Sequence, residues 1–364
     1  MSDLNRTPLF ALNAELGGKM VGFAGWEMPV QFAPGVMKEH LHCRAACGLF
    51  DVSHMGQVLL HGAGAAEALE ALVPVDIIGL KPGRQRYALF TNDEGGILDD
   101  LMVANYGDRL MVVVNAANAE ADIAHLKRHI EGVEVVENRA LIALQGPKAE
   151  AVLASAIEDF PARFMDIAEV ESAFGDLWIS RSGYTGEDGF EVSVPANRAE
   201  DFARKLLAHE ACEPIGLGAR DSLRLEAGLC LHGQDIDATT TPVEAALTWA
   251  LSKARKPGGA RAGGYPGAAV IEAQLADGPA RLRVGLAPEG RAPMRAGVEL
   301  FSGDDPAGTI TSGAFSPCLE RPISMGYVSA ALASPGTALE AELRGRRQPL
   351  QTATLPFIPA NFKR

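Results

Sequence analysis

The chain has 364 residues, of which 47% are hydrophobic and 22% charged, and its formal net charge at pH 7 is −13. This composition excludes a chain that is disordered throughout, and the length predicts two or three domains. No apolar run approaches the roughly 20 residues that a membrane-spanning helix needs, and the amino terminus has neither a signal-peptide nor a transit-peptide pattern. We therefore expect a cytoplasmic protein that contacts no membrane.

The first half of the chain has clear helical and strand patterns. Residues 34–47 have helical spacing, residues 48–62 alternate like a strand, and residues 65–72 are predicted to form a short helix. Residues 101–104 and 110–114 are predicted strands joined by a turn at 106–108, which makes them a hairpin. An amphipathic helix is predicted over residues 116–130, ending before Gly132.

The second half predicts strands at 141–144, 177–180 and 191–194 and a helix at 198–208. Residues 257–267 are almost entirely Gly, Pro, Ala and Arg and are predicted to form a linker. Short strands separated by turn residues follow at 282–286, 297–301, 308–313 and 323–328. This pattern predicts a small all-β carboxy-terminal domain, and the whole chain is predicted to be α+β.

The five cysteines are odd in number and scattered, which is not the pattern of a disulfide framework. We expect them to be reduced thiols in the protein core. Cys43 and Cys47 lie four residues apart, but no second tight pair of ligands follows at the spacing that a zinc site usually has. The sequence therefore predicts no metal.

Charge is unevenly distributed, with a net charge of +5 over residues 251–364 and −18 over residues 1–250. The basic clusters are short and lack interleaved aromatic residues, so they do not predict nucleic-acid binding. The asymmetry is either a solvated surface formed by chance or a docking surface for an anionic ligand or an acidic protein.

Two glycine patterns imitate nucleotide-binding motifs but differ from them at a decisive position. The segments that begin at Gly62 and Gly216 place Glu67 and Asp221 where the dinucleotide fingerprint needs its third glycine. A negative charge there would oppose a pyrophosphate at the helix start, and no P-loop motif occurs. Both segments are interpreted as turns.

Three groups of polar residues lie in turn-like or apolar surroundings. Asp99 and Asp100 precede an apolar strand and, because side chains alternate, point to opposite faces. Glu191 follows a glycine-rich turn and alternates with apolar neighbours, and Arg220 lies where a helix begins. Each motif alone is also compatible with a turn or a surface salt bridge, so composition and spacing do not identify a reaction.

Taken together, ordered motifs along essentially the whole chain resemble the glycine cleavage system T-protein family. The matching segments are TPLF (7–10), FAGWEMP (23–29), GLFDVSHMG (48–56), GGILDDL (95–101), VVNAAN (113–118), GYTGEDGFE (183–191), GLGARDSLRLEAG (216–228), TSGAFSP (311–317) and PFIPAN (356–361).

The resemblance implies three domains around a central folate site. These are a discontinuous α+β domain (1–50 with 138–256), an inserted α+β domain (51–137) and a β-barrel-like domain (268–364). It also implies an aminomethyltransferase that moves a one-carbon unit from the aminomethyl-lipoyl H protein to tetrahydrofolate, with release of ammonia and formation of 5,10-methylenetetrahydrofolate. Tetrahydrofolate would be a co-substrate, and no metal is implied.

The resemblance also assigns site residues. Asp100 is the catalytic carboxylate, which would manage protons near the reacting folate nitrogens, and Asp99 is a supporting acid. Glu191 would accept two N–H bonds from the 2-amino/N3 edge of the pterin, and Arg220 would bind folate at an end that the motif does not specify. Lower-ranked folate neighbours are Asn115, Tyr184, Tyr87 and Phe362. The last stands where the family commonly has tyrosine, so it keeps the ring and loses the hydroxyl.

Two alternatives on the same scaffold stay open. A folate-dependent demethylase of a small methylated sulfur or amine compound would keep Glu191 but change the donor-facing residues, and the complete GGILDD and SHMG motifs argue against it. A non-catalytic folate-binding iron–sulfur assembly factor would carry the signature K-G-C-Y-x-G-Q-E, whereas residues 226–235 read EAGLCLHGQD.

Overall fold

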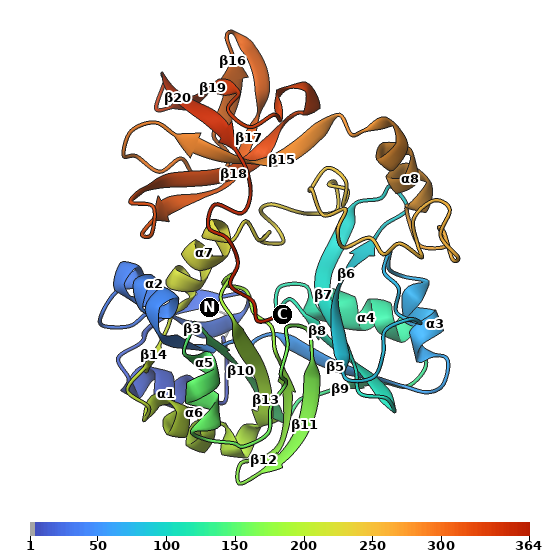
Figure 1. The fold of residues 1–364 in the computed structure, drawn as a ribbon, viewed down its shortest axis with the longest axis vertical. Coiled ribbons are helices and arrows are strands. Elements are labelled where there is room, and N and C mark those ends of the chain that lie inside the picture. The colour runs from blue at the N-terminus through green and yellow to red at the C-terminus, as the bar shows by residue number, and fades with distance from the viewer. Residues whose placement is uncertain (1–3) are drawn as a thin grey trace.

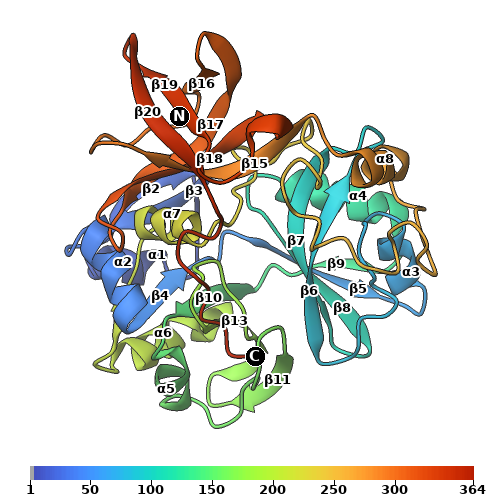
Figure 2. The ribbon, with the colours of Figure 1, turned by 45° about the horizontal axis from the view of Figure 1, so that its top comes forward.

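The computed structural model describes residues 4–364 and has three lobes that share no sheet with one another. Figures 1 and 2 show an orange and red lobe above two lobes that lie side by side. The first lobe combines blue and green segments, because some of its strands precede the second lobe in the sequence and others follow it. We propose that the three domains follow these sheets, with the boundaries predicted above.

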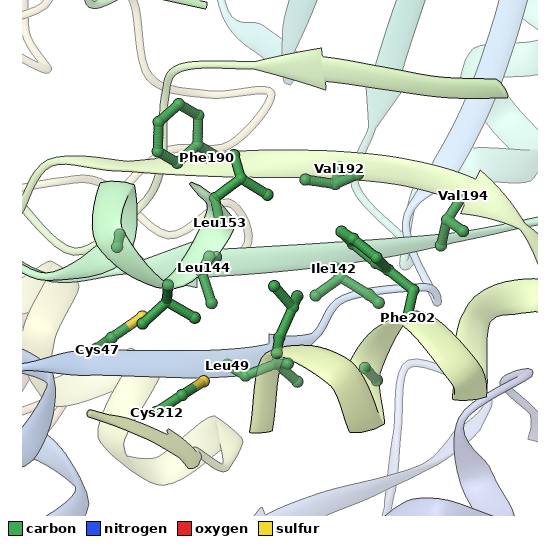
Figure 3. Close-up of a cluster of buried hydrophobic side chains, with 14 of the residues drawn as sticks. Cys47, Leu49, Ile142, Leu144, Leu153, Phe190, Val192, Val194, Phe202 and Cys212 are labelled. Carbon is green, nitrogen blue, oxygen red and sulfur yellow. The ribbon is translucent and has the colours of Figure 1, made fainter. Parts of the chain in front are cut away.

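The first lobe is built on a six-stranded sheet with the order β11-β12-β13-β10-β4-β14. Its strands are β4 (Cys47–Asp51), β10 (Arg139–Gln145), β11 (Ile167–Ser172), β12 (Gly175–Ser180), β13 (Gly189–Pro195) and β14 (Cys212–Pro214). Helices α5 (Ala149–Ala154) and α6 (Ala199–Leu207) pack on one face, over the apolar core drawn in Figure 3. Phe190 and Val192 of β13 point into this core, so Glu191 faces the other side, as the alternation predicts.

A three-stranded sheet with the order β1-β3-β2 and three further helices complete the first lobe. These elements are β1 (Asn5–Arg6), α1 (Phe10–Glu15), β2 (Lys19–Phe23), β3 (Trp26–Gln31), α2 (Val36–Ala45) and α7 (Leu217–Glu226). Helix α7 packs against α2 and β3 and also against two strands of the third lobe. It therefore connects the first lobe to the third.

The second lobe is a five-stranded antiparallel sheet with the order β6-β7-β8-β5-β9. Its elements are β5 (Gly56–His61), α3 (Ala65–Glu70), β6 (Arg84–Thr91), β7 (Ile97–Asn105), β8 (Arg109–Val114), α4 (Ala119–His129) and β9 (Val133–Val135). Apolar residues of α3 and α4 share one core with the sheet. The predicted hairpin is confirmed by the pairing of β7 with β8.

Two predictions about strand boundaries are wrong. The strand expected to begin at Leu101 begins at Ile97, because it also pairs with β6, which the pattern did not predict. Asp99 and Asp100 therefore lie inside the strand. The alternating stretch 48–62 forms two strands in different sheets, β4 and β5, because the chain crosses from the first lobe to the second between them. The predicted helices at 34–47, 65–72, 116–130 and 198–208 are confirmed with slightly shorter ends.

The third lobe is a closed barrel with the strand order β15-β18-β17-β16-β19-β20, which confirms the predicted all-β carboxy-terminal domain. Its strands are β15 (Arg281–Pro288), β16 (Glu299–Ser302), β17 (Asp305–Ser316), β18 (Arg321–Ser329), β19 (Ala338–Leu343) and β20 (Arg346–Ala353). Pairing of β15 with β20 closes it, so no strand edge stays unpaired at the seam. Over residues 4–364, no helix has both the length and the apolar character needed to cross a membrane.

Residues 257–267 contain neither helix nor strand, as predicted, but the segment around them is not a free spacer. Arg255 and Arg261 both reach the buried carboxylate of Glu70 on α3, and the Arg261 Nε–Glu70 Oε1 distance is 2.6 Å. These ion pairs hold the segment against the second lobe. Helix α8 (Ala268–Asp277), which follows, was not predicted; it buries only Ile271 completely, with Ala268 and Leu275 partly buried on the same face.

Candidate active site

Asp100 lies on β7, and the Asn115 side chain immediately after β8 donates to its Oδ1 atom at 3.0 Å. Burial and the charge of neighbouring Asp99 raise the pKa of Asp100 to about 6, although the Tyr87 hydroxyl and the Asn115 amide favour the anion. A carboxyl group with this pKa changes protonation near neutral pH, so it is suited to accept and release a proton.

The turn before β7 is glycine for a steric reason. A Cβ atom on Gly96 would lie only 1.9 Å from the carbonyl oxygen of Ala238. This close approach lets the Ile97 N–H donate to the carbonyl oxygens of Asp237 and Thr240, at 3.1 and 3.0 Å. The chain that follows α7 is thereby held against the start of β7, next to both acids.

Asp99 is fully buried and anchors the turn between β8 and α4. It accepts hydrogen bonds from the Asn115 N–H at 3.2 Å, the Asn115 side-chain amide at 2.9 Å and the Asn118 side-chain amide at 2.8 Å. Because the Asn115 amide also donates to Asp100, one side chain connects the two acids. This arrangement agrees with the expected supporting role of Asp99.

Two tyrosines, Tyr87 and Tyr184, lie near Asp100, and Trp249 stacks on one of them. The rings of Tyr87 and Trp249 are stacked, with centroids 5.3 Å apart, and Trp249 is 63% exposed. The Tyr184 hydroxyl donates to the carbonyl oxygen of Cys230. Burial first, and the Asp100 charge in addition, raise the pKa values of both tyrosines, so both stay neutral donors.

Glu191 and Arg220 lie together at the end of this aromatic group. The Arg220 guanidinium covers the Tyr184 ring at 4.8 Å, and the Ser182 hydroxyl donates to Glu191 Oε2 at 3.3 Å. Burial raises the pKa of Glu191, and Arg220 opposes that shift. The two side chains interact by charge, but no hydrogen bond joins their described atoms.

Two buried polar atoms in this region lack a hydrogen-bond partner among the described residues: Nη1 of Arg220 and Nδ1 of His54. Burial and the Arg220 charge lower the pKa of His54 to about 3, so its ring is neutral. A buried polar atom without a partner costs roughly 1–3 kcal/mol, which native proteins seldom leave uncompensated. These atoms therefore favour a site that a polar ligand completes.

A cavity lies where the first and second lobes face one another, and Glu191 lines it. Met102 and Val113 of the second lobe and Trp178 and Ser180 of the first also form its walls. Its volume of about 20 Å³ holds roughly one water molecule, so it marks the boundary between the two lobes beside Glu191 and is not itself large enough for an aromatic ligand.

The described contacts connect six of the seven predicted site residues, directly or through one another: Tyr87, Asp100, Asn115, Tyr184, Glu191 and Arg220. Phe362 is held differently. Its ring stacks on Phe164 with centroids 4.1 Å apart, where the chain end returns from the barrel to the first lobe and the Asn361 N–H donates to the Gly186 carbonyl oxygen (Figure 1). No contact described for residues 4–364 joins Phe362 to the other six.

Sequence reasoning missed Trp249 and gave His54 no role. Trp249 lies in a stretch without helix or strand, so it had no local signal, and only its stacking on Tyr87 indicates a function. His54 was noted only as part of a motif. Its burial beside Arg220 depends on segments far apart in sequence.

His40, Glu226 and Cys318 are the one group of possible metal ligands found among the described residues. The Glu226 carboxylate already accepts hydrogen bonds from His40 at 2.9 Å, Arg44 at 3.0 Å and Ser316 at 2.5 Å. A positively charged guanidinium so close opposes a divalent cation. Burial alone would raise the pKa of Glu226, but His40, Ser316 and Arg44 together lower it to about 2, which indicates a structural anion.

Comparison with known proteins covers the whole chain. Residues 9–255 match the family model described as the GCVT N-terminal domain, and residues 281–358 match the glycine cleavage T-protein C-terminal barrel domain. Among curated relatives, the mitochondrial aminomethyltransferase of Dictyostelium discoideum is 43% identical over 100% of this chain and 94% of its own length. The mitochondrial aminomethyltransferase of Mus musculus is 45% identical over 99% of this chain and 91% of its own length.

A solved structure is similar over its full length as well. The glycine cleavage system aminomethyltransferase T from Bartonella henselae is 45% identical, superposes with a TM-score of 0.93, and the match covers 100% of both chains.

Proposed function

This chain belongs to the glycine cleavage T-protein family, and from that premise we propose that it transfers the aminomethyl carbon of a lipoyl-bound donor to tetrahydrofolate. It is an aminomethyltransferase. The donor carbon loses its bonds to sulfur and to nitrogen and gains bonds to two folate nitrogens. The two hydrogens displaced from those nitrogens leave with the lipoyl thiol and with ammonia, so atoms balance without an oxidant.

The observation that carries the proposal is one acid that titrates near neutrality in the same region as buried polar atoms without a hydrogen-bond partner among residues 4–364. Asp100 has its pKa raised to about 6, while Glu191, Arg220 Nη1 and His54 Nδ1 leave donors and acceptors free nearby. The 2-amino/N3 edge of a reduced pterin presents two adjacent N–H donors, which a carboxylate such as Glu191 accepts in a bidentate contact. Tetrahydrofolate would supply the nucleophilic nitrogens that accept the carbon.

The residues of the chain have separate tasks in this proposal. Glu191 and Arg220 bind folate, and Trp249 and Tyr87 give a ring surface for its aromatic part. Asn115 orients Asp100, whose anion accepts a proton from a reacting nitrogen and stabilises the positive charge that develops there. No covalent enzyme nucleophile is needed, and the thiols of Cys43 and Cys230 have pKa values raised to about 12 by burial, which keeps them unreactive.

The lipoylated H protein is the proposed donor, and we propose that the arginines at one turn of the barrel contribute to its docking. Arg344 and Arg346 are exposed at the turn between β19 and β20. Arg347 is a poorer candidate because its guanidinium packs on the ring of Phe301. The double change Arg344→Glu/Arg346→Glu should raise the KM for the carrier and leave folate affinity unchanged; an unaltered KM contradicts this docking surface.

The cytoplasmic location expected from the sequence stays a prediction, because the names of the Dictyostelium and mouse relatives place those proteins in mitochondria.

The test is ammonia release from aminomethyl-loaded lipoyl carrier, with and without tetrahydrofolate, by the wild type and by Asp100→Asn. We expect folate-stimulated release by the wild type and a rate about 100-fold or more lower in the variant, since general acid–base catalysis contributes about 10²–10⁴-fold. Asp93→Asn is the matched control, because Asp93 is an exposed acid in the turn before β7. Folate binding without folate-stimulated release would favour the demethylase or the non-catalytic alternative.

A further inference from the structure

A second buried acid lies behind Asp99, on the face of β7 that α4 covers. Asp122, in the first turn of α4, is 4% exposed, and Asp99 is fully buried. Asn118 places the two acids side by side, because its carbonyl oxygen accepts from the Asp122 N–H at 2.9 Å while its side-chain amide donates to Asp99 Oδ1 at 2.8 Å. The two carboxyl groups also interact directly, which contributes to the raised pKa of Asp122. The Oδ2 atom of Asp122 has no N–H or O–H donor among residues 4–364.

The hydrogen bonds indicate which of these two acids carries the proton. Two carboxylates in contact inside a protein cannot both carry a charge, because neither water nor distance separates them. Asp99 receives three N–H bonds from Asn115 and Asn118, so it is the anion. Since no N–H group among residues 4–364 donates to Asp122 Oδ2, Asp122 is assigned as the protonated acid that donates its O–H to Asp99.

Asp99 is linked to Asp100 through a single amide. The Asn115 side-chain nitrogen lies 2.9 Å from Asp99 Oδ1 and 3.0 Å from Asp100 Oδ1. A charge on Asp122 would repel Asp99 and act on Asp100 as well, since both acids interact with it electrostatically. The protonation of Asp122 therefore influences the orientation and the pKa of Asp100.

We propose that Asp122 is a positioning residue that shares one proton with Asp99, keeps Asp99 in place as the acceptor for Asn115, and thereby orients Asp100. The role assigned to Asp100 rests on the proposed function, whereas the shared proton does not.

The other titratable groups near this pair do not supply the neutralising proton. His232, from the segment after α7, has Nδ1 3.7 Å from Asp99 Oδ1, but that nitrogen accepts from Asn118 at 2.8 Å while Nε2 donates to the Ile97 carbonyl oxygen at 3.3 Å. Because Nδ1 accepts there, it has no proton to donate to Asp99. His125, one turn further along α4, packs its ring on Phe90, and burial and neighbouring charges lower its pKa. The proton therefore stays on the acid pair.

The shared proton can be observed directly by infrared spectroscopy. Burial, and then the contact with Asp99, raise the pKa of Asp122 to about 9. At pH 7.5 we expect the wild type to show the carbonyl stretch of a protonated buried carboxylic acid that persists until the pH approaches 9. Asp122→Asn should lack this band. A wild-type band that disappears below pH 7, or one that survives in Asp122→Asn, overturns the proposal.

The positioning role is tested by the pH dependence of folate-stimulated ammonia release. Asp122→Asn replaces the O–H donor by an N–H donor, so it should keep at least a third of the wild-type rate at pH 7.5 and lose the decline of kcat near pH 9. Asp122→Ala removes the donor and should lower kcat at least tenfold with the KM for folate unchanged. Glu120→Gln, an exposed acid on the same helix, should match the wild type throughout.

The outcomes separate this inference from the proposed function. An active wild type whose alkaline decline persists in Asp122→Asn overturns the positioning role alone. A wild type that shows the infrared band but no folate-stimulated release overturns the proposed function and leaves the shared proton established.

Discussion

Helix α7 carries two buried polar clusters that differ in how completely their atoms are paired. Near its start, Arg220 interacts with Glu191 and Tyr184 but leaves Nη1 without a hydrogen bond among the described residues. At its end, Glu226 accepts hydrogen bonds from His40, Arg44 and Ser316. The first cluster has capacity left for a ligand, whereas the second has none.

A buried binding site and a buried structural ion pair differ in whether their polar atoms already have partners. A buried donor without a partner lowers the stability of the protein until a ligand accepts its hydrogen bond. A buried donor that already has a partner lowers stability only when that partner is removed. Removing the charge of Glu226 should therefore lower the free energy of unfolding, whereas removing the charge of Glu191 should lower the affinity for a ligand. The predictions below test this difference, beginning with the largest effect.

The strongest effect is expected at the paired cluster. Glu226→Gln keeps the volume but leaves Arg44 and His40 without their shared anion, so the free energy of unfolding should fall by about 3–5 kcal/mol. Urea denaturation measures it. Glu213→Gln is the matched control, because Glu213 pairs with His42 at 3.5 Å from a half-exposed position. A loss below about 1 kcal/mol, the value of a surface pair, would show that the cluster is not structural.

At the unpaired cluster, the expected loss is in binding. Glu191→Gln should weaken tetrahydrofolate binding by about 10- to 100-fold, since hydrogen bonds to a charged group contribute about 1.5–3 kcal/mol. The free energy of unfolding should not fall, because burial raises the pKa of Glu191 and so makes its charge unfavourable. Isothermal titration measures the affinity, with Glu169→Gln on β11, an exposed acid two strands away in the same sheet, as control. Equal affinity in variant and wild type would remove Glu191 from the folate site.

A smaller loss of affinity is expected from Trp249. Trp249→Leu removes the ring that stacks on Tyr87, and aromatic pairs contribute about 0.5–1.5 kcal/mol, so the folate Kd should rise by roughly 3- to 10-fold. Stability should be nearly unchanged because the side chain is largely exposed. Quenching of tryptophan fluorescence by folate, compared between the wild type and the variant, reports whether the ring is at the site.

The smallest effect concerns stability at Asp100. Its raised folded-state pKa means that its contribution to stability is fully present below the unfolded pKa of about 4 and is lost as the pH rises through about 6. Two pKa units correspond to roughly 2.7 kcal/mol, but the variant also loses the hydrogen bonds that Tyr87 and Asn115 make to the anion. Asp100→Asn should therefore be more stable than the wild type at pH 8 by only about 1 kcal/mol or less. In the same pH window, kcat/KM of the wild type should rise about tenfold per pH unit below about 6 and level off above it.

Thermal unfolding of the wild type and Asp100→Asn at pH 4 and pH 8 measures this difference in stability. A variant that is less stable than the wild type at pH 8 would place Asp100 with the structural anions instead.

The sequence by itself determined the fold class, the barrel and most of the helices, because turn residues and hydrophobic periodicity are local signals. It also predicted that Asp99 and Asp100 face opposite sides, since alternation along a strand needs no tertiary information. The resemblance of its motifs supplied the site residues, six of which the structure connects.

Only the tertiary structure decided which of these groups interact and which atoms stay unpaired. Trp249 reaches Tyr87 from an irregular segment, and His54 meets Arg220 from the crossing between β4 and β5 that joins the first lobe to the second. In the sequence, Asp122 is an ordinary acid in the first turn of an amphipathic helix. It becomes a buried partner of Asp99 only because α4 packs on the sheet. Burial and pairing depend on contacts between distant segments, and these determine the pKa values and the free hydrogen-bonding capacity on which the chemistry depends.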